Sequence, residues 1–177
     1  LLSVLMETFG FSYYVMLPVV ARDVLEVGAS GLGYLSAAGS VGALAGTLVL
    51  AGLGDFKAKW PMLTVASAAA GVGLLLFAFS PWFTVSLAVA GLVGAALAVY
   101  DASMATLLQL LSADALRGRI LGLYGMTWGF TPAGGFLAGI VASIVSVPFA
   151  IGLGGTVIVG HAVGVVARRA PQGVDRD

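Results

Sequence analysis

The stretch that decides the fold is residues 60–100, which contains no charged side chain and reads WPMLTVASAAAGVGLLLFAFSPWFTVSLAVAGLVGAALAVY. A helix needs about 20 apolar residues to cross the ~30 Å hydrocarbon core of a bilayer. The stretch is long enough for two crossings. Ser80-Pro81-Trp82 marks the break between them, because proline donates no backbone hydrogen bond and favours a helix start. The stretch therefore predicts a helical hairpin within a membrane.

Two further uncharged stretches extend this pattern along the chain. Residues 27–54 are long enough for one crossing, and residues 120–167 for two, with a break at Ser146-Val147-Pro148. No ten-residue alternation of polar and apolar residues suggests a membrane β-barrel. We predict an all-α polytopic membrane protein with six transmembrane helices. They span residues 1–21, 30–53, 61–79, 82–111, 119–143 and 148–167.

The composition excludes several classes of function. Of the residues, 60% are hydrophobic and 9% are charged, against about a quarter charged in soluble domains. Eight basic and eight acidic residues leave no excess charge to bind nucleic acid. There is no cysteine and one histidine, and neither Lys57 nor Lys59 follows a glycine as in a phosphate-binding loop. We expect no cofactor, no metal site and no enzyme activity.

The distribution of basic residues predicts the orientation. Seven lie in the loops after the second and fourth helices and in the carboxyl-terminal tail, whereas Arg22 alone lies on the opposite side. Basic loops stay in the cytoplasm. We expect a multi-pass protein of the cell membrane with both ends of this segment cytoplasmic. Trp60 and Trp82 would then lie at the inner and outer headgroup levels.

Two acids, Glu7 and Asp101, lie inside apolar stretches. An acid at a helix centre costs about 2.5 to 3.5 kcal/mol on insertion scales. No lysine or arginine is available within the bundle to neutralise them, so we expect each to be protonated part of the time. Such carboxyl groups can couple proton flow to transport, although a helix contact or a solvated helix end would also explain them.

Two helix faces carry aromatic and hydroxyl side chains that suit an amphipathic substrate. With 3.6 residues per turn, Phe11, Tyr14 and Pro18 share the face of Glu7. A second face is predicted on the fifth helix, where Pro132 should introduce a kink. Packing is the alternative role for both faces. The residues of the second face are Tyr124, Thr127, Trp128 and Thr131.

We predict a six-helix bundle over residues 1–169, followed by a polar cytoplasmic tail over residues 170–177. An internal repeat divides the bundle into two three-helix units, at about residues 1–79 and 82–167. The sequence GALAG at residues 42–46 recurs as GFLAG at residues 135–139. Because each unit crosses the membrane an odd number of times, the second unit has the opposite orientation to the first. Gly42, Gly46, Gly135 and Gly139 permit close helix packing. The second and fifth helices could slide on another domain, or the glycines could serve packing alone.

These features resemble the carboxyl-terminal half of a major facilitator superfamily transporter. The stretch LLSADALRGR at residues 110–119, with the later PAGG at residues 132–135 and LAG at residues 137–139, is similar to the enterobactin and macrolide exporter-like branch. So is LPVVARDVL at residues 17–25. Residues 51–60, AGLGDFKAKW, match the inner-loop signature of the superfamily only at Leu53, Asp55 and Lys59.

The resemblance implies proton-coupled export of small amphipathic molecules, such as drugs or siderophores, by alternating access. The partners would be the substrate, protons, the lipid bilayer and a missing amino-terminal six-helix half. The first and fourth helices would line the central cavity. The predicted cytoplasmic gate loops contain Asp55, Lys59, Asp114, Arg117 and Arg119, and lipid anchoring is the alternative role of the Lys57 and Lys59 loop.

Two other functions are open. Gly28-Ala29-Ser30-Gly31 and His161-Ala162-Val163-Gly164 resemble the serine and histidine motifs of a rhomboid-like intramembrane protease. The predicted helices place Ser30 at the outer face and His161 ~20 Å deeper, which is too far for a catalytic dyad. A non-transporting helical assembly subunit is the third reading. It does not account for Glu7 and Asp101.

Overall fold

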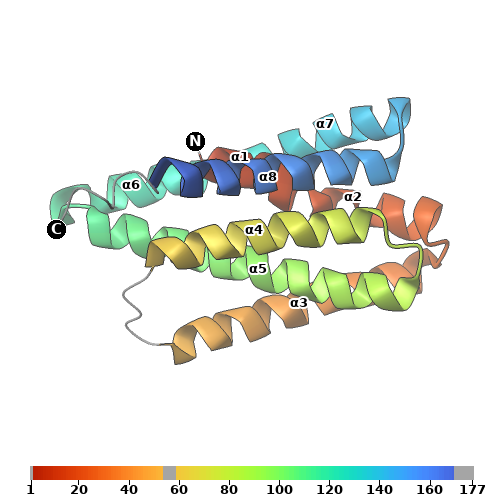
Figure 1. Cartoon of the computed structure of the whole chain (residues 1–177), viewed down its shortest axis with the longest axis horizontal. Helices are drawn as coiled ribbons and strands as arrows, with labels where there is room; N and C mark the ends of the chain where they lie inside the picture. The colour runs from red at the N-terminus through yellow and green to blue at the C-terminus, as the bar shows by residue number, and fades with distance from the viewer. Residues whose placement is uncertain (1, 54–58, 170–177) are drawn as a thin grey trace.

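The computed structural model describes residues 2–53 and 59–169 of the chain (Figure 1). Within these ranges there are helices and no strand. Six helical segments in the described part are long and apolar enough to cross a membrane, which confirms the prediction of an all-α polytopic membrane protein. These spans are Leu2–Val24, Gly28–Gly52, Trp60–Ala78, Phe83–Leu111, Asp114–Ile144 and Val147–Val166.

Two of the six spans change helix type along their length. The first span consists of α1 (Leu2–Leu5), the π-helix η1 (Met6–Phe11), α2 (Tyr13–Val19) and the π-helix η2 (Val20–Val24). The fifth consists of α6 (Asp114–Met126), the 3-10 turn η3 (Thr127–Gly129) and α7 (Phe130–Ile144). The others are the regular helices α3 (Gly28–Gly52), α4 (Lys59–Ala78), α5 (Phe83–Leu111) and α8 (Val147–Arg169).

The fifth span begins five residues earlier than the sequence pattern predicted. Asp114 lies in the first turn of α6 and pairs with Arg117, with 2.6 Å between its Oδ1 and the arginine Nη2. A carboxylate at this position also interacts favourably with the helix dipole. Asp114, Arg117 and Arg119 are therefore exposed residues of a helix, and our placement of them in a loop was wrong.

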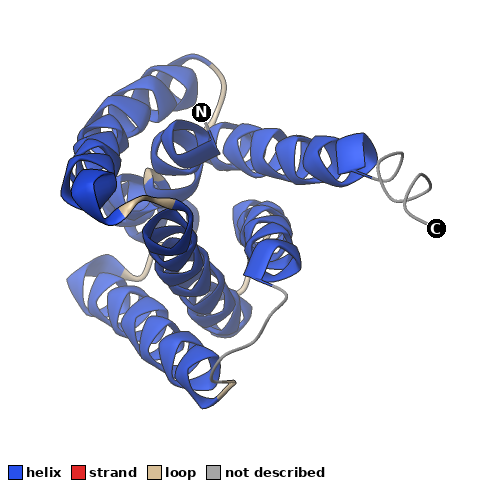
Figure 2. Ribbon diagram, turned by 90° about the vertical axis from the view of Figure 1, so that its left-hand side faces the viewer, coloured by secondary structure: helices blue, strands red, loops and turns tan. Residues whose placement is uncertain are grey.

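Helix α5 lies at the centre of the bundle and packs against both α3 and α4 (Figure 1). Helix α4 also packs against α8, and α7 packs against α8 and η1. Figure 2 shows that the helices do not lie in one flat layer, and the buried side chains between them form the interior of the bundle. The core of this interior is apolar, and its most buried side chains include Leu35, Leu74, Val93 and Leu97.

Glycines make the contact between α3 and α5 unusually close. A Cβ atom added at Gly42 would lie 1.9 Å from the carbonyl oxygen of Gly91, and one at Gly46 would lie 2.7 Å from the carbonyl oxygen of Ala95. At Gly94 an added Cβ would lie 2.1 Å from the carbonyl oxygen of Gly39. The two backbones therefore touch, as small residues allow in membranes.

The glycines of the fifth span divide into two groups. Gly134 and Gly135 are buried against the first span, where an added Cβ would meet the Thr8 carbonyl oxygen and the Val15 side chain. At Gly139 an added Cβ would meet nothing within 4 Å. The structure therefore favours the packing alternative at three of these glycines, because the partners of Gly42, Gly46 and Gly135 lie within this chain.

Helix α6 is sparsely packed. Tyr124 is its one buried residue, and all thirteen residues of α6 belong to the described part of the chain. An added Cβ at Gly118, Gly122 or Gly125 would meet nothing within 4 Å. The attachment of α6 to the bundle therefore depends strongly on the contacts of Tyr124.

Candidate functional site

Glu7 is buried in the first span and is hydrogen-bonded to the fifth. Its side chain is 4% exposed, and the hydroxyl of Thr131 donates a hydrogen bond of 2.5 Å to its Oε2. Glu7 belongs to η1, and single π-helical turns within α-helices occur frequently at functional sites. The bond joins η1 to α7 across the bundle interior.

Asp101 makes a second bond of the same kind. It lies on α5 and is partly buried, and the hydroxyl of Tyr124 on α6 donates a hydrogen bond to its Oδ1. The hydroxyl of Thr127 donates to the Tyr124 carbonyl oxygen at 2.7 Å, within the same span. Each acid is thus bound by a hydroxyl of the fifth span, and the two bonds lie on either side of the η3 turn.

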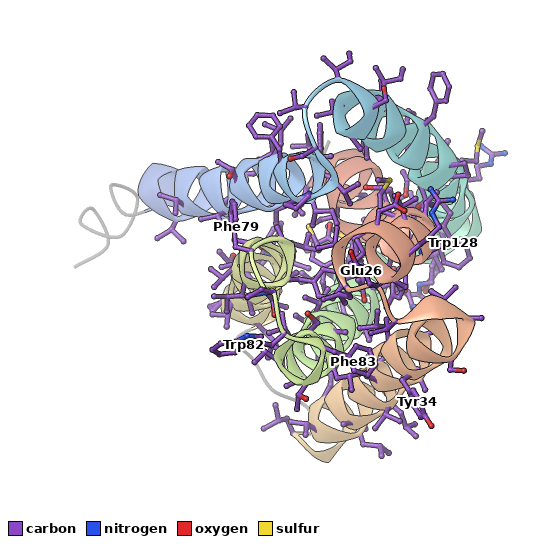
Figure 3. The ribbon with its side chains drawn as sticks, turned by 90° about the vertical axis from the view of Figure 1, so that its right-hand side faces the viewer. Glu26, Tyr34, Phe79, Trp82, Phe83 and Trp128 are labelled. Atoms are coloured by element: carbon purple, nitrogen blue, oxygen red, sulfur yellow. The ribbon has the colours of Figure 1, made fainter. Side chains whose placement is uncertain are left out.

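Both carboxyl groups line a single pocket of about 240 Å³. The other lining residues are Phe11 of the first span and Trp128 and Thr131 of the fifth. Trp128 is 58% exposed and lies where the fifth span faces the first (Figure 3). The pocket therefore combines two acids, two aromatic rings and a hydroxyl group contributed by three different spans.

Tyr14 lies outside this pocket, contrary to the predicted helix face. Its ring packs on Tyr13, with 4.3 Å between the ring centroids, and the side chain is 36% exposed. The prediction assumed 3.6 residues per turn throughout, but a π-helical turn uses more residues and rotates every later side chain around the axis. Phe11 and Glu7 stay together, and Tyr14 moves away.

Pro132 and the η3 turn set the position of Trp128. Pro132 is the third residue of α7, and its ring excludes a regular bond to the carbonyl group four residues earlier, which belongs to Trp128. The three residues Thr127–Gly129 adopt 3-10 geometry immediately before α7. The expected irregularity therefore lies just before the proline and tightens the helix at the pocket.

Two of the predicted gate residues cannot be placed at the site. Asp55 lies outside the described residues, and Lys59 begins α4 but its side chain is outside them as well. The predicted tail, residues 170–177, is also outside. No group of three or more metal-binding side chains occurs among the residues that the structure describes.

Sequence reasoning missed how the acids are paired, and it missed Tyr100. This residue is 1% exposed and adjacent to Asp101 on α5. Its position beside an intramembrane acid was a usable signal. Ser103, 4% exposed on the same helix, adds a second buried hydroxyl near this site.

The serine and histidine of the protease alternative occupy different parts of the bundle. Ser30 is exposed near the start of α3. His161 lies 14 residues after the start of α8, ~21 Å along that helix. It lines a pocket with Trp60, which is near the start of α4 and hence at the opposite end of the bundle from Ser30. This geometry does not form a dyad.

The six spans and their interhelical pocket define the chain as a multi-pass helical membrane protein. A family model described as transmembrane secretion effector matches residues 1–176, and the chain belongs to this family of major facilitator superfamily transporters. It is therefore a membrane transporter. No curated protein and no solved structure matches the chain.

Proposed function

We propose that the chain is part of a secondary exporter that exchanges protons for small amphipathic molecules through the pocket of Glu7 and Asp101. The observation that carries the proposal is that two intramembrane carboxyl groups line one pocket. Acids within membrane spans are costly, and they commonly mark proton relays or substrate pathways. The ring systems of Phe11 and Trp128 supply apolar surface for a substrate beside the acids.

The hydrogen bonds support a mechanism for coupling. A carboxylate accepts hydrogen bonds only, whereas a protonated carboxyl group can also donate one. Protonation of Asp101 or Glu7 therefore changes the strength of the bonds that hold Tyr124 and Thr131. Because these bonds attach the fifth span on both sides of η3, proton binding would bias the position of that span and hence access to the pocket.

The six spans would work with a second six-helix bundle by alternating access, as in transporters built from two such repeats. We further propose location in the cell membrane with the Arg119 end of the bundle in the cytoplasm. The basic residues concentrated at that end support this orientation.

The test uses membrane vesicles that contain the full-length protein and the fluorescent amphipathic cation ethidium as probe. An imposed pH gradient should drive ethidium accumulation, and a protonophore should abolish it. Accumulation that persists unchanged when the gradient is collapsed would contradict proton coupling. Infrared difference spectra upon pH change offer a readout that needs no substrate, because a protonated carboxyl group has its own carbonyl band. That band should be reduced in the Glu7→Gln variant.

A further inference from the structure

A second pocket, of about 220 Å³, shares no lining residue with the candidate site. We call it the apolar cavity. Its walls come from α1, α4, α5 and α8. Its lining includes Leu2, Trp60, Ser67, Met104, His161 and Ala162.

The lining of the apolar cavity offers few polar groups to water. Ser67 is 3% exposed and Ala162 is 2% exposed, and both face the interior of the bundle. The hydroxyl of Ser67 already donates to the Thr64 carbonyl oxygen at 2.9 Å, and that of Thr64 donates to the Trp60 carbonyl oxygen at 3.0 Å. Water in a cavity needs two to four polar partners. The hydroxyl groups of this cavity are engaged within their own helix.

The size and chemistry of the cavity fit a small ring compound. An apolar cavity of roughly 150 Å³ in a soluble protein stays dry and binds benzene. The apolar cavity here is larger and, unlike that one, partly open, and two aromatic side chains, Trp60 and His161, lie in its wall. Aromatic rings gain energy from edge and offset contacts with one another beyond simple burial. These features favour an aromatic occupant over a purely aliphatic one.

We propose that the apolar cavity binds an uncharged, lipophilic molecule of about one aromatic ring, which enters from the bilayer. This site is separate from the acidic pocket and does not depend on the proposed export function. The two pockets are nevertheless lined by two of the same spans, the first span and α5. Leu2 lies five residues before Glu7 on the first span, and Met104 lies three residues after Asp101 on α5. An occupant would thus press on both helices that carry the acids.

Tryptophan fluorescence tests the proposal in the full chain. These 177 residues contain three tryptophans, so the double variant Trp82→Phe/Trp128→Phe leaves Trp60 as the one tryptophan among them. Bromobenzene is the probe, because its heavy atom quenches a nearby indole. We expect saturable quenching of Trp60 that p-xylene reverses. The matched control keeps Trp82 alone, whose side chain is 71% exposed and points away from the bundle (Figure 3). It should show only quenching proportional to the probe dissolved in the bilayer.

A variant that fills the apolar cavity provides the second test of the proposal. Ser67→Leu places additional carbon atoms in the apolar cavity and should reduce the saturable component several-fold. If that variant does not fold, reversal by p-xylene in the parental background still decides the question. Linear quenching of Trp60 with the same slope as Trp82 would overturn the proposal. Strong quenching of Trp60 by lipids with brominated acyl chains, undiminished by p-xylene, would also overturn it and assign the cavity to a lipid tail.

Discussion

The hydroxyl of Tyr124 donates a hydrogen bond to Asp101, and Tyr124 is the one buried residue within α6, a helix described over its full length. The bond therefore does more than satisfy an intramembrane acid. It fixes the half of the fifth span that has open space beside Gly118, Gly122 and Gly125. Loss of this single contact should release a whole segment of helix.

Tyr124→Phe is the first test. The change removes the donor and keeps the ring, so we expect weaker docking of α6 by about 1.5–3 kcal/mol, the range for hydrogen bonds to charged groups. Hydrogen exchange of residues 114–126 should become faster, while exchange in α4 and α5 stays as in the parent. Tyr34→Phe, at a tyrosine on α3 that is 64% exposed, is the control. Equal exchange in both variants would show that other contacts hold α6.

Neutral replacements of the acids test energy coupling. Asp101→Asn and Glu7→Gln keep shape and hydrogen-bonding capacity but cannot titrate. At the coupling residue, the change should abolish ethidium accumulation driven by a pH gradient and leave downhill exchange of ethidium largely intact. We expect Glu7 to bind the proton and Asp101 to contact the substrate or gate. Parental accumulation and pH profile in both variants would show that neither acid couples protons.

The glycine contact between α3 and α5 predicts a sharp contrast in stability. Gly42→Ala forces a methyl group toward the Gly91 carbonyl oxygen and should destabilise the protein by about 1–3 kcal/mol, as overpacking does. Gly139→Ala, at a site with open space, should leave the unfolding temperature in mild detergent nearly unchanged. Matching unfolding temperatures for the two variants would contradict the close approach of the two backbones.

The proposed orientation can be read from single cysteines, because the chain has none of its own. Cysteines at Ala29 and Val147, at one end of the bundle, should react with an impermeant thiol reagent in intact cells. A cysteine at Ala113, at the other end and exposed, should react only after the cells are opened. The reverse pattern would invert the proposed topology.

The spans were predictable from the sequence because a helix that crosses the bilayer must be apolar over the thickness of its hydrocarbon core. Any uncharged stretch long enough to cross is a helix, and the prolines at positions 81 and 148 mark where two such stretches turn back. The ends of helices were less predictable. At the start of α6, Asp114 lies in the first turn and pairs with Arg117, whereas charge counting assigned both residues to a loop.

The candidate site was predictable in its residue types but not in its pairing. Glu7, Asp101, Phe11, Trp128 and Thr131 were all singled out, and the structure brings them to one pocket. Which hydroxyl binds which acid depends on how distant spans pack. The departure of Tyr14 depends on the π-helical η1, for which the apolar pattern gives no signal.

The bond between Thr131 and Glu7 has a consequence for how the protein is made. Its two residues are 124 positions apart. The ribosome therefore completes the second, third and fourth spans, and more than half of the fifth, before Thr131 is synthesised. Until then the first span must enter the membrane with an acid that lacks this partner. The first span therefore reaches its final packing in the bundle late in biogenesis, after the fifth span has been synthesised.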